Sequence, residues 1–289
     1  MRDAMVAAAV GLLLIPMGNR SHAGVISPTA SPQAQALVTC GPQRTSGQQG
    51  PGPQRLTEAE KASRLAQLQA AAASADACSE FELGRAYATG ELGPTDKARA
   101  FALLEKSAAQ GITRAYGDLG VLLFNGAGVA QDYGLALQYL LKATDAGEMK
   151  APRYVGMLYE DGKGTAVDPA KAAQYYAIAA NRGDITGQCL LGSLYERGAG
   201  VPRDLDLAEH WYLESQRRGD EVAAPAMAAL GNLFETRGDG KGSDAIALSW
   251  YRKAADAGIV DAKNDIERLT VTHRPPAAGR NECLLHFHS

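Results

Sequence analysis

A glycine recurs at a nearly constant interval through two thirds of this 289-residue chain. Taking this glycine as the origin of each copy, the five origins are Gly84, Gly120, Gly156, Gly192 and Gly231. The spacings between them are 36, 36, 36 and 39 residues. An alanine follows each origin by sixteen residues, at Ala100, Ala136, Ala172, Ala208 and Ala247. A fixed period in this range is typical of a stacked repeat array, in which no unit buries its apolar face alone.

One copy, Ala115 to Gly147, indicates the structure of the unit. Apolar residues occur at helical spacing on both sides of a glycine-rich turn at residues 125–129. The second helix opens at Asp132, a residue type that accepts hydrogen bonds from the first helical turn. The equivalent cap positions of the other copies are Asp96, Asp168, Asp204 and Ser243. Each copy is therefore predicted to be an αα-hairpin.

Gly120 falls in the middle of the first helix, where glycine costs roughly 0.5–1 kcal/mol relative to alanine. We expect a close approach of the paired helix to offset this cost, with Ala136 as the small residue opposite. The aromatic residues at regular positions, such as Tyr159 and Tyr175, are interpreted as core packing rather than as a ligand platform.

The best copies are GMLYEDGKGTAVDPAKAAQYYAIAANRGD from Gly156 and GSLYERGAGVPRDLDLAEHWYLESQRRGD from Gly192. This pattern resembles the Sel1-like repeat, a relative of the tetratricopeptide repeat. The resemblance implies an all-α fold, a right-handed α/α superhelix of about five αα-hairpins over residues 76–271. It is specific for fold and says little about function.

The segments outside the repeats have different compositions. Residues 1–23 have an uncharged apolar run followed by Ser21-His22-Ala23, as in a cleavable signal peptide, and the run is too short to span a bilayer. Residues 24–55 are rich in Pro, Gly, Gln and Ser and predict a disordered linker. Residues 56–75 begin with Thr57-x-x-Glu60, a capping box, and predict an N-terminal capping helix. Residues 272–289 are expected to form an irregular tail. The protein is therefore expected to be periplasmic or secreted, without stable membrane insertion after cleavage.

Charge and motifs exclude several functions. Without residues 1–23 the chain has 27 basic and 31 acidic residues, a balance that argues against nucleic acid as a partner. None of the common catalytic strings occurs, so no catalytic residue, cofactor or metal is predicted. The glycine-rich loop of residues 238–242 joins two helices and is not interpreted as a phosphate cradle. Cys283, His286 and His288 contain ligand-type atoms, but three donors near a chain end do not make a structural metal site.

Four cysteines remain after removal of the signal peptide: Cys40, Cys78, Cys189 and Cys283. An even number in an exported protein permits disulfides. Cys78 and Cys189 lie three units apart on rigid helices, too far for a bridge. We favour Cys40–Cys78 with Cys189–Cys283, and buried thiols remain the alternative. Cysteine-rich Sel1-like proteins reported to handle β-lactams carry a cysteine pair within each repeat. This chain lacks such pairs, so that activity does not transfer.

Comparison of the five copies indicates a surface for a partner. Three positions of the first helix, at −3, +1 and +4 from the origin glycine, share one face and vary between copies; we call this face the first-helix strip. The strip residues expected to contact a partner on a concave face are Phe81, Arg85, Val121, Phe124, Arg153, Met157, Glu160, Ser193, Glu196, Asn232 and Glu235. Ala88, Gly117, Cys189 and Ala228 complete the strip. The alternative is that these positions are merely unconstrained and face solvent.

The sequence thus favours a non-catalytic adaptor of the bacterial cell envelope that binds a protein or peptide. Two alternatives remain: an envelope enzyme or cell-wall hydrolase accessory with its site in the groove, and a cytoplasmic scaffold with an uncleaved N-terminus. The oligomeric state is left open.

Overall fold

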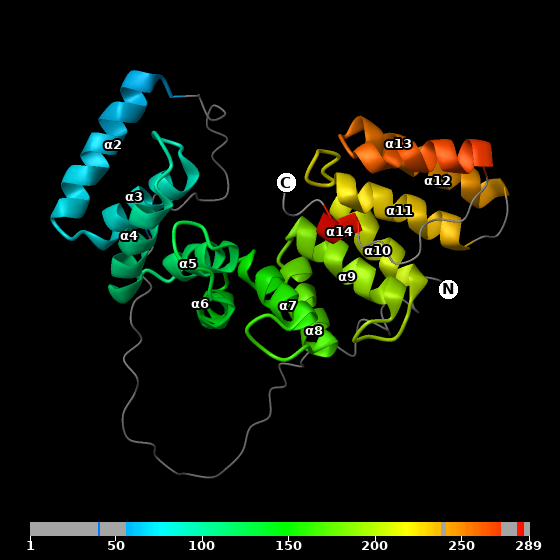
Figure 1. Cartoon of the computed structure of the whole chain (residues 1–289), viewed down its shortest axis with the longest axis horizontal. Helices are drawn as coiled ribbons and strands as arrows, with labels where there is room; N and C mark the ends of the chain where they lie inside the picture. Colours follow the sequence, from blue (N-terminus) through cyan, green and yellow to red (C-terminus); the bar gives the residue numbers. More distant parts are fainter. Residues whose placement is uncertain (1–39, 41–55, 238–240, 273–281, 286–289) are drawn as a thin grey trace, which may run out of the picture. The chain divides into compact units, whose positions relative to one another are not determined.

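The computed structural model describes residues 40, 56–237, 241–272 and 282–285. The predicted signal peptide lies outside the described residues. The linker also lies outside them apart from residue 40, and so does the tail apart from residues 272 and 282–285. Within the described part of the chain every regular element is a helix (Figure 1). The helices are α2 (Glu58–Ala73), α3 (Ala77–Thr89), α4 (Lys97–Ala109), α5 (Arg114–Asn125), α6 (Tyr133–Asp145), α7 (Ala151–Asp161), α8 (Pro169–Asn181), α9 (Ile185–Arg197), α10 (Leu205–Gln216), α11 (Ala224–Arg237), α12 (Lys241–Asp256), α13 (Val260–Glu267), the π-helical turn η1 (Arg268–Thr272) and α14 (Glu282–Leu285).

Helices α3 to α12 form five hairpins, each made of a first helix and a second helix: α3–α4, α5–α6, α7–α8, α9–α10 and α11–α12. The second helix of each hairpin also packs on the first helix of the next. This alternation of contacts within and between units is that of a helical solenoid, as the repeat period predicted.

Both ends of the array are covered by additional helices. Helix α2 packs on α3 through Leu68, and its start is fixed by a capping box in which Thr57 and Glu60 bond to each other's backbone N–H. At the other end α13 packs on α12, and Leu269 of η1 is buried in the same cluster. The helix that closes this end of the array changes from α-helical to π-helical geometry after Glu267.

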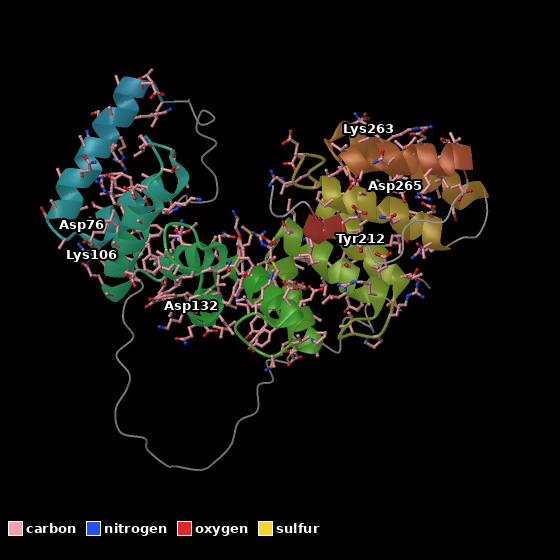
Figure 2. The ribbon with its side chains drawn as sticks, in the orientation of Figure 1. Asp76, Lys106, Asp132, Tyr212, Lys263 and Asp265 are labelled. Atoms are coloured by element: carbon pink, nitrogen blue, oxygen red, sulfur yellow. A yellow bond between two sulfur atoms is a disulfide. The ribbon has the colours of Figure 1, made fainter. Side chains whose placement is uncertain are left out.

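Aspartates cap four of the five second helices, as predicted. Asp96, Asp132, Asp168 and Asp204 each accept a hydrogen bond from a backbone N–H of the following turn. Asp132 is labelled at this position in Figure 2. Ser243, expected as the fifth cap, instead lies inside α12, which begins at Lys241, and it is buried. The cap prediction was wrong for this unit because the helix starts three residues earlier than a cap at Ser243 requires, within the glycine-rich segment.

The origin glycines do mark a close approach, but the residue opposite is not the one expected. A Cβ atom added to Gly120 would lie 2.6 Å from Leu140, and one added to Gly192 would lie 2.8 Å from Tyr212. These partners stand twenty residues after the origin, at Leu104, Leu140, Tyr176, Tyr212 and Tyr251. Alanines such as Ala136 are fully buried beside them and approach the glycine through their carbonyl oxygen.

Candidate functional site

Two hollows lie along the first-helix strip. The smaller, which we call the Val121 hollow, has a volume of about 300 Å³ and is lined by the strip residues Ala88, Gly117 and Val121. The larger, the Arg153 hollow, has a volume of about 620 Å³ and is lined by Arg153 and Cys189 of the strip. The surface that sequence comparison selected is therefore hollowed at two places.

The Val121 hollow combines an apolar floor with charges of both signs. Val121 and Tyr154 supply apolar surface, and Asp118, Glu148 and Lys150 line the same hollow. Arg85 lies 3.7 Å from Asp118, yet burial dominates and raises the pKa of the Asp118 carboxyl. Glu148 accepts a hydrogen bond from the backbone N–H of Ala151 at the start of α7. Such a surface can bind a polypeptide segment that offers an apolar side chain together with polar groups.

In the Arg153 hollow the strip arginine is already paired. Arg153 Nη1 donates to both carboxylate oxygens of Asp184, at 3.1 and 2.9 Å, and both side chains are buried. Asp184 in turn caps α9 by accepting from the backbone N–H of Gly187. Arg153 thus ties α7 to the start of α9, and the expectation that it faces a partner was wrong. Met149 and Val222 are exposed apolar residues of this hollow, and Lys150, Arg218 and Glu221 are exposed charged residues of the same lining.

The strip glutamates also have partners inside the repeat. The hydroxyl of Tyr176 donates to Glu160 and that of Tyr212 donates to Glu196, both at 2.7 Å, and the hydroxyl of Tyr251 lies 2.9 Å from Glu235. Arg197 adds an ion pair to Glu160, and Arg268 adds one to Glu235. Each pair joins the first and second helix of one hairpin. The prediction that these glutamates bind a partner was therefore wrong. Their carboxylates instead connect the two helices of each hairpin.

Burial changes the acid–base behaviour of these pairs. Burial and the adjacent glutamate carboxylates raise the pKa of Tyr176 and Tyr212 well above the ordinary tyrosine value, and the pKa of Tyr251 shifts in the same direction. Burial also raises the pKa of Glu196, against the opposing hydrogen bond from Tyr212.

Three apolar strip residues belong to the core. Phe81, Phe124 and Met157 are each less than 5% exposed. Phe81 packs in one cluster with Cys40, and the Arg114 guanidinium lies 5.3 Å above its ring. The prediction that these side chains face a partner was wrong, because segments from neighbouring units and from outside the repeats cover them.

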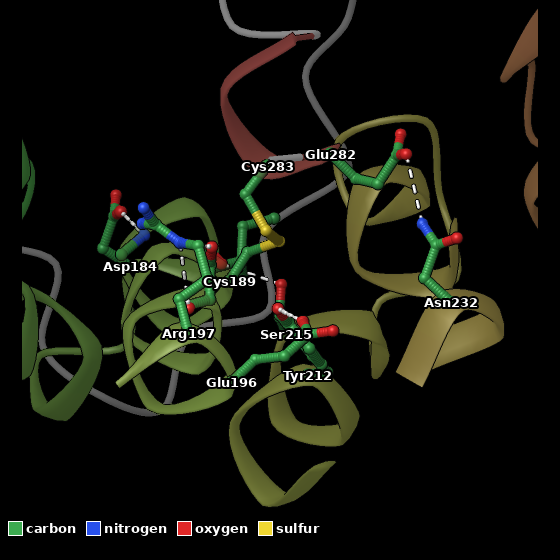
Figure 3. Close-up of a disulfide and its surroundings, with 12 residues drawn as sticks. Asp184, Cys189, Glu196, Arg197, Tyr212, Ser215, Asn232, Glu282 and Cys283 are labelled. Atoms are coloured by element: carbon green, nitrogen blue, oxygen red, sulfur yellow. Dashed lines mark hydrogen bonds between the residues drawn. A yellow bond between two sulfur atoms is a disulfide. The ribbon is translucent and has the colours of Figure 1, made fainter. Parts of the chain in front are cut away.

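Two of the four strip residues still to be placed, Ser193 and Asn232, lie on α9 and α11, the helices on which the C-terminal segment packs. Helix α14 packs on α9 and α11, and Cys283 forms a disulfide with Cys189 (Figure 3). Asn232 Nδ2 donates to Glu282 Oε1 at 3.1 Å, and Ser193 is buried. The strip is thus closed over units four and five and open at the Val121 hollow, where Arg85 and Val121 retain exposed surface.

A second disulfide joins Cys40 to Cys78, with Cα atoms 5.1 Å apart, and the corresponding distance for Cys189–Cys283 is 5.7 Å. This is the pairing that the sequence favoured, and the buried-thiol alternative does not hold.

Cys283 is consequently no metal ligand in this state. His286, His288 and residues 238–240 of the glycine-rich loop lie outside the described residues. Among the residues that the structure does describe, no three His, Cys, Asp or Glu side chains cluster as a metal site would require. No described helix has the length and apolar character needed to cross a membrane.

Comparison with known proteins agrees with this architecture. The family model described as Sel1 repeat matches five segments, residues 79–112, 113–148, 153–184, 185–220 and 224–259. The chain belongs to the Sel1 repeat family. Sel1-repeat solenoid proteins are generally protein-interaction adaptors. No curated protein matches the chain.

Two solved Sel1 structures are similar to this member of the family. One is a protective antigen present in uropathogenic Escherichia coli strains, which is 30% identical with a TM-score of 0.63. The alignment covers 76% of this chain and 46% of the antigen chain, so this protein spans less than half of that structure. The other is a Sel1 repeat protein from Oxalobacter formigenes, 26% identical with a TM-score of 0.57, over 68% of this chain and 85% of that one.

Proposed function

We propose that this Sel1 repeat protein is a non-catalytic adaptor of the bacterial cell envelope that binds a protein or peptide partner at the Val121 hollow. The proposal rests on which residues of the first-helix strip are buried or paired and which are not. Most strip residues are buried or paired within the chain, whereas Val121 is only partly buried and lines a hollow of the described surface.

The composition of the hollow favours a polypeptide over a reactive small molecule. Its described lining residues include no His, Cys or Ser, the residue types that most often act as catalytic base or nucleophile. The lining includes the acidic residues Asp118 and Glu148 and the basic residues Lys97 and Lys150, so it has no single dominant charge. An extended or helical segment with one apolar side chain for Val121 and hydrogen-bonding groups for this rim fits the hollow.

Two features support export. Disulfides form and persist in oxidising compartments, and two of them join segments outside the repeats to the array. The sequence of residues 1–23 has the organisation of a cleavable signal peptide. Mass spectrometry of the mature N-terminus tests this part of the proposal, because an intact Met1 would contradict cleavage and export.

The binding site is tested with a matched pair of valine substitutions. Val121→Glu places a charge in the hollow, and Val167→Glu makes the same change at a side chain that is 62% exposed in the loop between α7 and α8. We expect a partner that co-purifies with the unmodified protein from its own host to be retained by Val167→Glu and lost by Val121→Glu. Equal retention by both variants, at equal thermal stability, would overturn the proposed site.

A further inference from the structure

The C-terminal helix α14 is seated on the strip of units four and five as a bound peptide would be. Glu282 and Cys283 are each 3% exposed, and Leu284 packs against the same cluster as Cys189. Figure 3 shows the segment above α9, with the disulfide on one side and the contact to Asn232 on the other. A four-residue helix has no stability of its own, so its conformation depends on the surface beneath it.

The surface beneath it is specialised for this contact. Asn232 takes the +1 position of its unit, where the other four copies have Arg85, Val121, Met157 and Ser193, so the repeat does not require an amide there. The hydroxyl of Tyr251 lies 2.8 Å from Asn232 Oδ1 and 2.9 Å from Glu235 Oε2, so its one hydrogen is shared between the amide oxygen and the carboxylate. The NH₂ group of the same amide donates to the buried carboxylate of Glu282. Asn232 thus connects Glu282 to the Tyr251 hydroxyl of the second helix.

We infer that the strip around Cys189, Ser193 and Asn232 is a second binding surface, specific for a short helical turn with a carboxylate, a small residue and a leucine in succession. The chain's own Glu282-Cys283-Leu284 is its resident ligand, latched by the disulfide. The partner is a protein segment of the same chemistry, which docks when the latch is open. This surface adds to the proposed function, which places another contact at the Val121 hollow.

Opening the latch requires a dithiol reductant. One thiolate of the reductant attacks a sulfur of Cys189–Cys283 and breaks the disulfide, forming a mixed disulfide with one cysteine and releasing the other. The second thiol of the reductant then displaces the remaining cysteine. Two electrons and two protons pass to the protein, which gains two thiols, and the reductant leaves as a disulfide. Both cysteines line the Arg153 hollow, which gives a reductant an approach from that side.

The test uses the full chain with Glu282→Lys, Cys283→Ser and Leu284→Ser, so that the resident segment no longer competes and Cys189 is the one cysteine left outside the Cys40–Cys78 disulfide. The probe is a synthetic peptide of residues 280–289 whose cysteine is activated as a thiopyridyl disulfide. The Cys189 thiolate attacks the peptide sulfur and releases thiopyridone, whose absorbance gives the rate. Matched peptides carry Glu282→Lys or Leu284→Ser, and reaction of each peptide with glutathione calibrates its intrinsic reactivity.

After calibration we expect the unchanged peptide to react about tenfold faster than either altered peptide, the ratio that about 1.4 kcal/mol of recognition gives. Asn232→Ala in the same chain should abolish the preference for Glu282 and leave the preference for Leu284. Equal calibrated rates for all three peptides would overturn the inference, since α14 would then be held by the disulfide alone.

A second readout avoids reliance on one variant. In the chain with all four cysteines, Asn232→Ala should make dithiothreitol reduce Cys189–Cys283 about tenfold faster and leave the Cys40–Cys78 rate unchanged, as followed by alkylation and mass spectrometry. An unchanged rate at Cys189–Cys283 would contradict the inference. These measurements use purified protein and synthetic probes, so their failure leaves the result for Val121→Glu standing, and the reverse also holds.

Discussion

Three residues of each later unit act together: the origin glycine, the tyrosine twenty positions later, and the glutamate four positions after the glycine. In unit four these are Gly192, Tyr212 and Glu196. The glycine leaves room for the tyrosine ring, and the glutamate accepts from the tyrosine hydroxyl, which would otherwise be buried without a partner. Units one and two have leucine at the tyrosine position and carry Ala88 and Phe124 at the glutamate position.

Removal of one such hydroxyl measures the contribution of the pair. Tyr176→Phe leaves the Glu160 carboxylate without its 2.7 Å donor, so we expect the free energy of unfolding to fall by about 1–3 kcal/mol. Tyr175→Phe is the matched control, because Tyr175 is the neighbouring residue of α8 and is only partly buried. Chemical denaturation of the three proteins gives the comparison, and equal midpoints for both variants would refute a structural role for the Tyr176–Glu160 pair.

The raised tyrosine pKa values predict a loss of stability at alkaline pH. In the unfolded chain these tyrosines release protons near their ordinary pKa of about 10, whereas the folded state retains them. The unfolded state then binds fewer protons than the folded state, so stability decreases as pH rises through about 10 and beyond. Tyr212→Phe should make this decrease shallower when thermal unfolding is followed against pH. An unaltered slope would show that Tyr212 titrates normally in the folded protein.

The pairing of glutamate with tyrosine was visible in the sequence, but only when both helices of a hairpin are compared. Among the five copies, glutamate follows the origin by four residues only where tyrosine follows it by twenty. Comparison of first helices alone makes Glu160, Glu196 and Glu235 look unconstrained. Their constraint comes from the second helix, so the partner-binding interpretation failed for them.

At the scale of the helix, position in the unit decides what a glycine does. Gly192 lies where an added Cβ would be 2.8 Å from Tyr212, whereas Gly134 in α6 would meet only the Asp132 carboxylate at 3.4 Å. Gly192→Ala should lower stability by about 1–3 kcal/mol through overpacking. Gly134→Ala should leave stability unchanged or raise it by up to about 1 kcal/mol, because alanine is the better helix former. Denaturation midpoints that shift in the same direction would contradict the assigned close approach.

Helix existence and pairing were predictable because they depend on local signals that recur five times. Period, glycine turns and aspartate caps each occur within about twenty residues of the helix that they define. The prediction that Ser243 caps α12 failed because this helix starts at Lys241, before the serine that occupies the cap position when the five copies are compared. A loop with a different glycine pattern changes where its helix starts, and spacing alone does not reveal this.

At the scale of the whole molecule, the two disulfides attach segments outside the repeats to the first-helix side of the array. The sequence separations that they close are 38 and 94 residues. The cysteine count predicted that bridges were permitted, and the distance between rigid helices removed one pairing. What the sequence did not reveal is that α14 packs on α9 and α11 and contacts Asn232, because a four-residue helix has no periodic signal.

The central claim is that the first-helix strip is open at Val121 and closed at Asn232, and photo-crosslinking in the host tests it most directly. A photoreactive amino acid is placed at position 121, 232 or, as a control, 167. We predict a covalent adduct with another protein from position 121, a link to the chain's own residues 282–285 from position 232, and neither product from position 167. An adduct pattern at position 121 that matches position 167, or an absence of the internal link from position 232, would contradict the account.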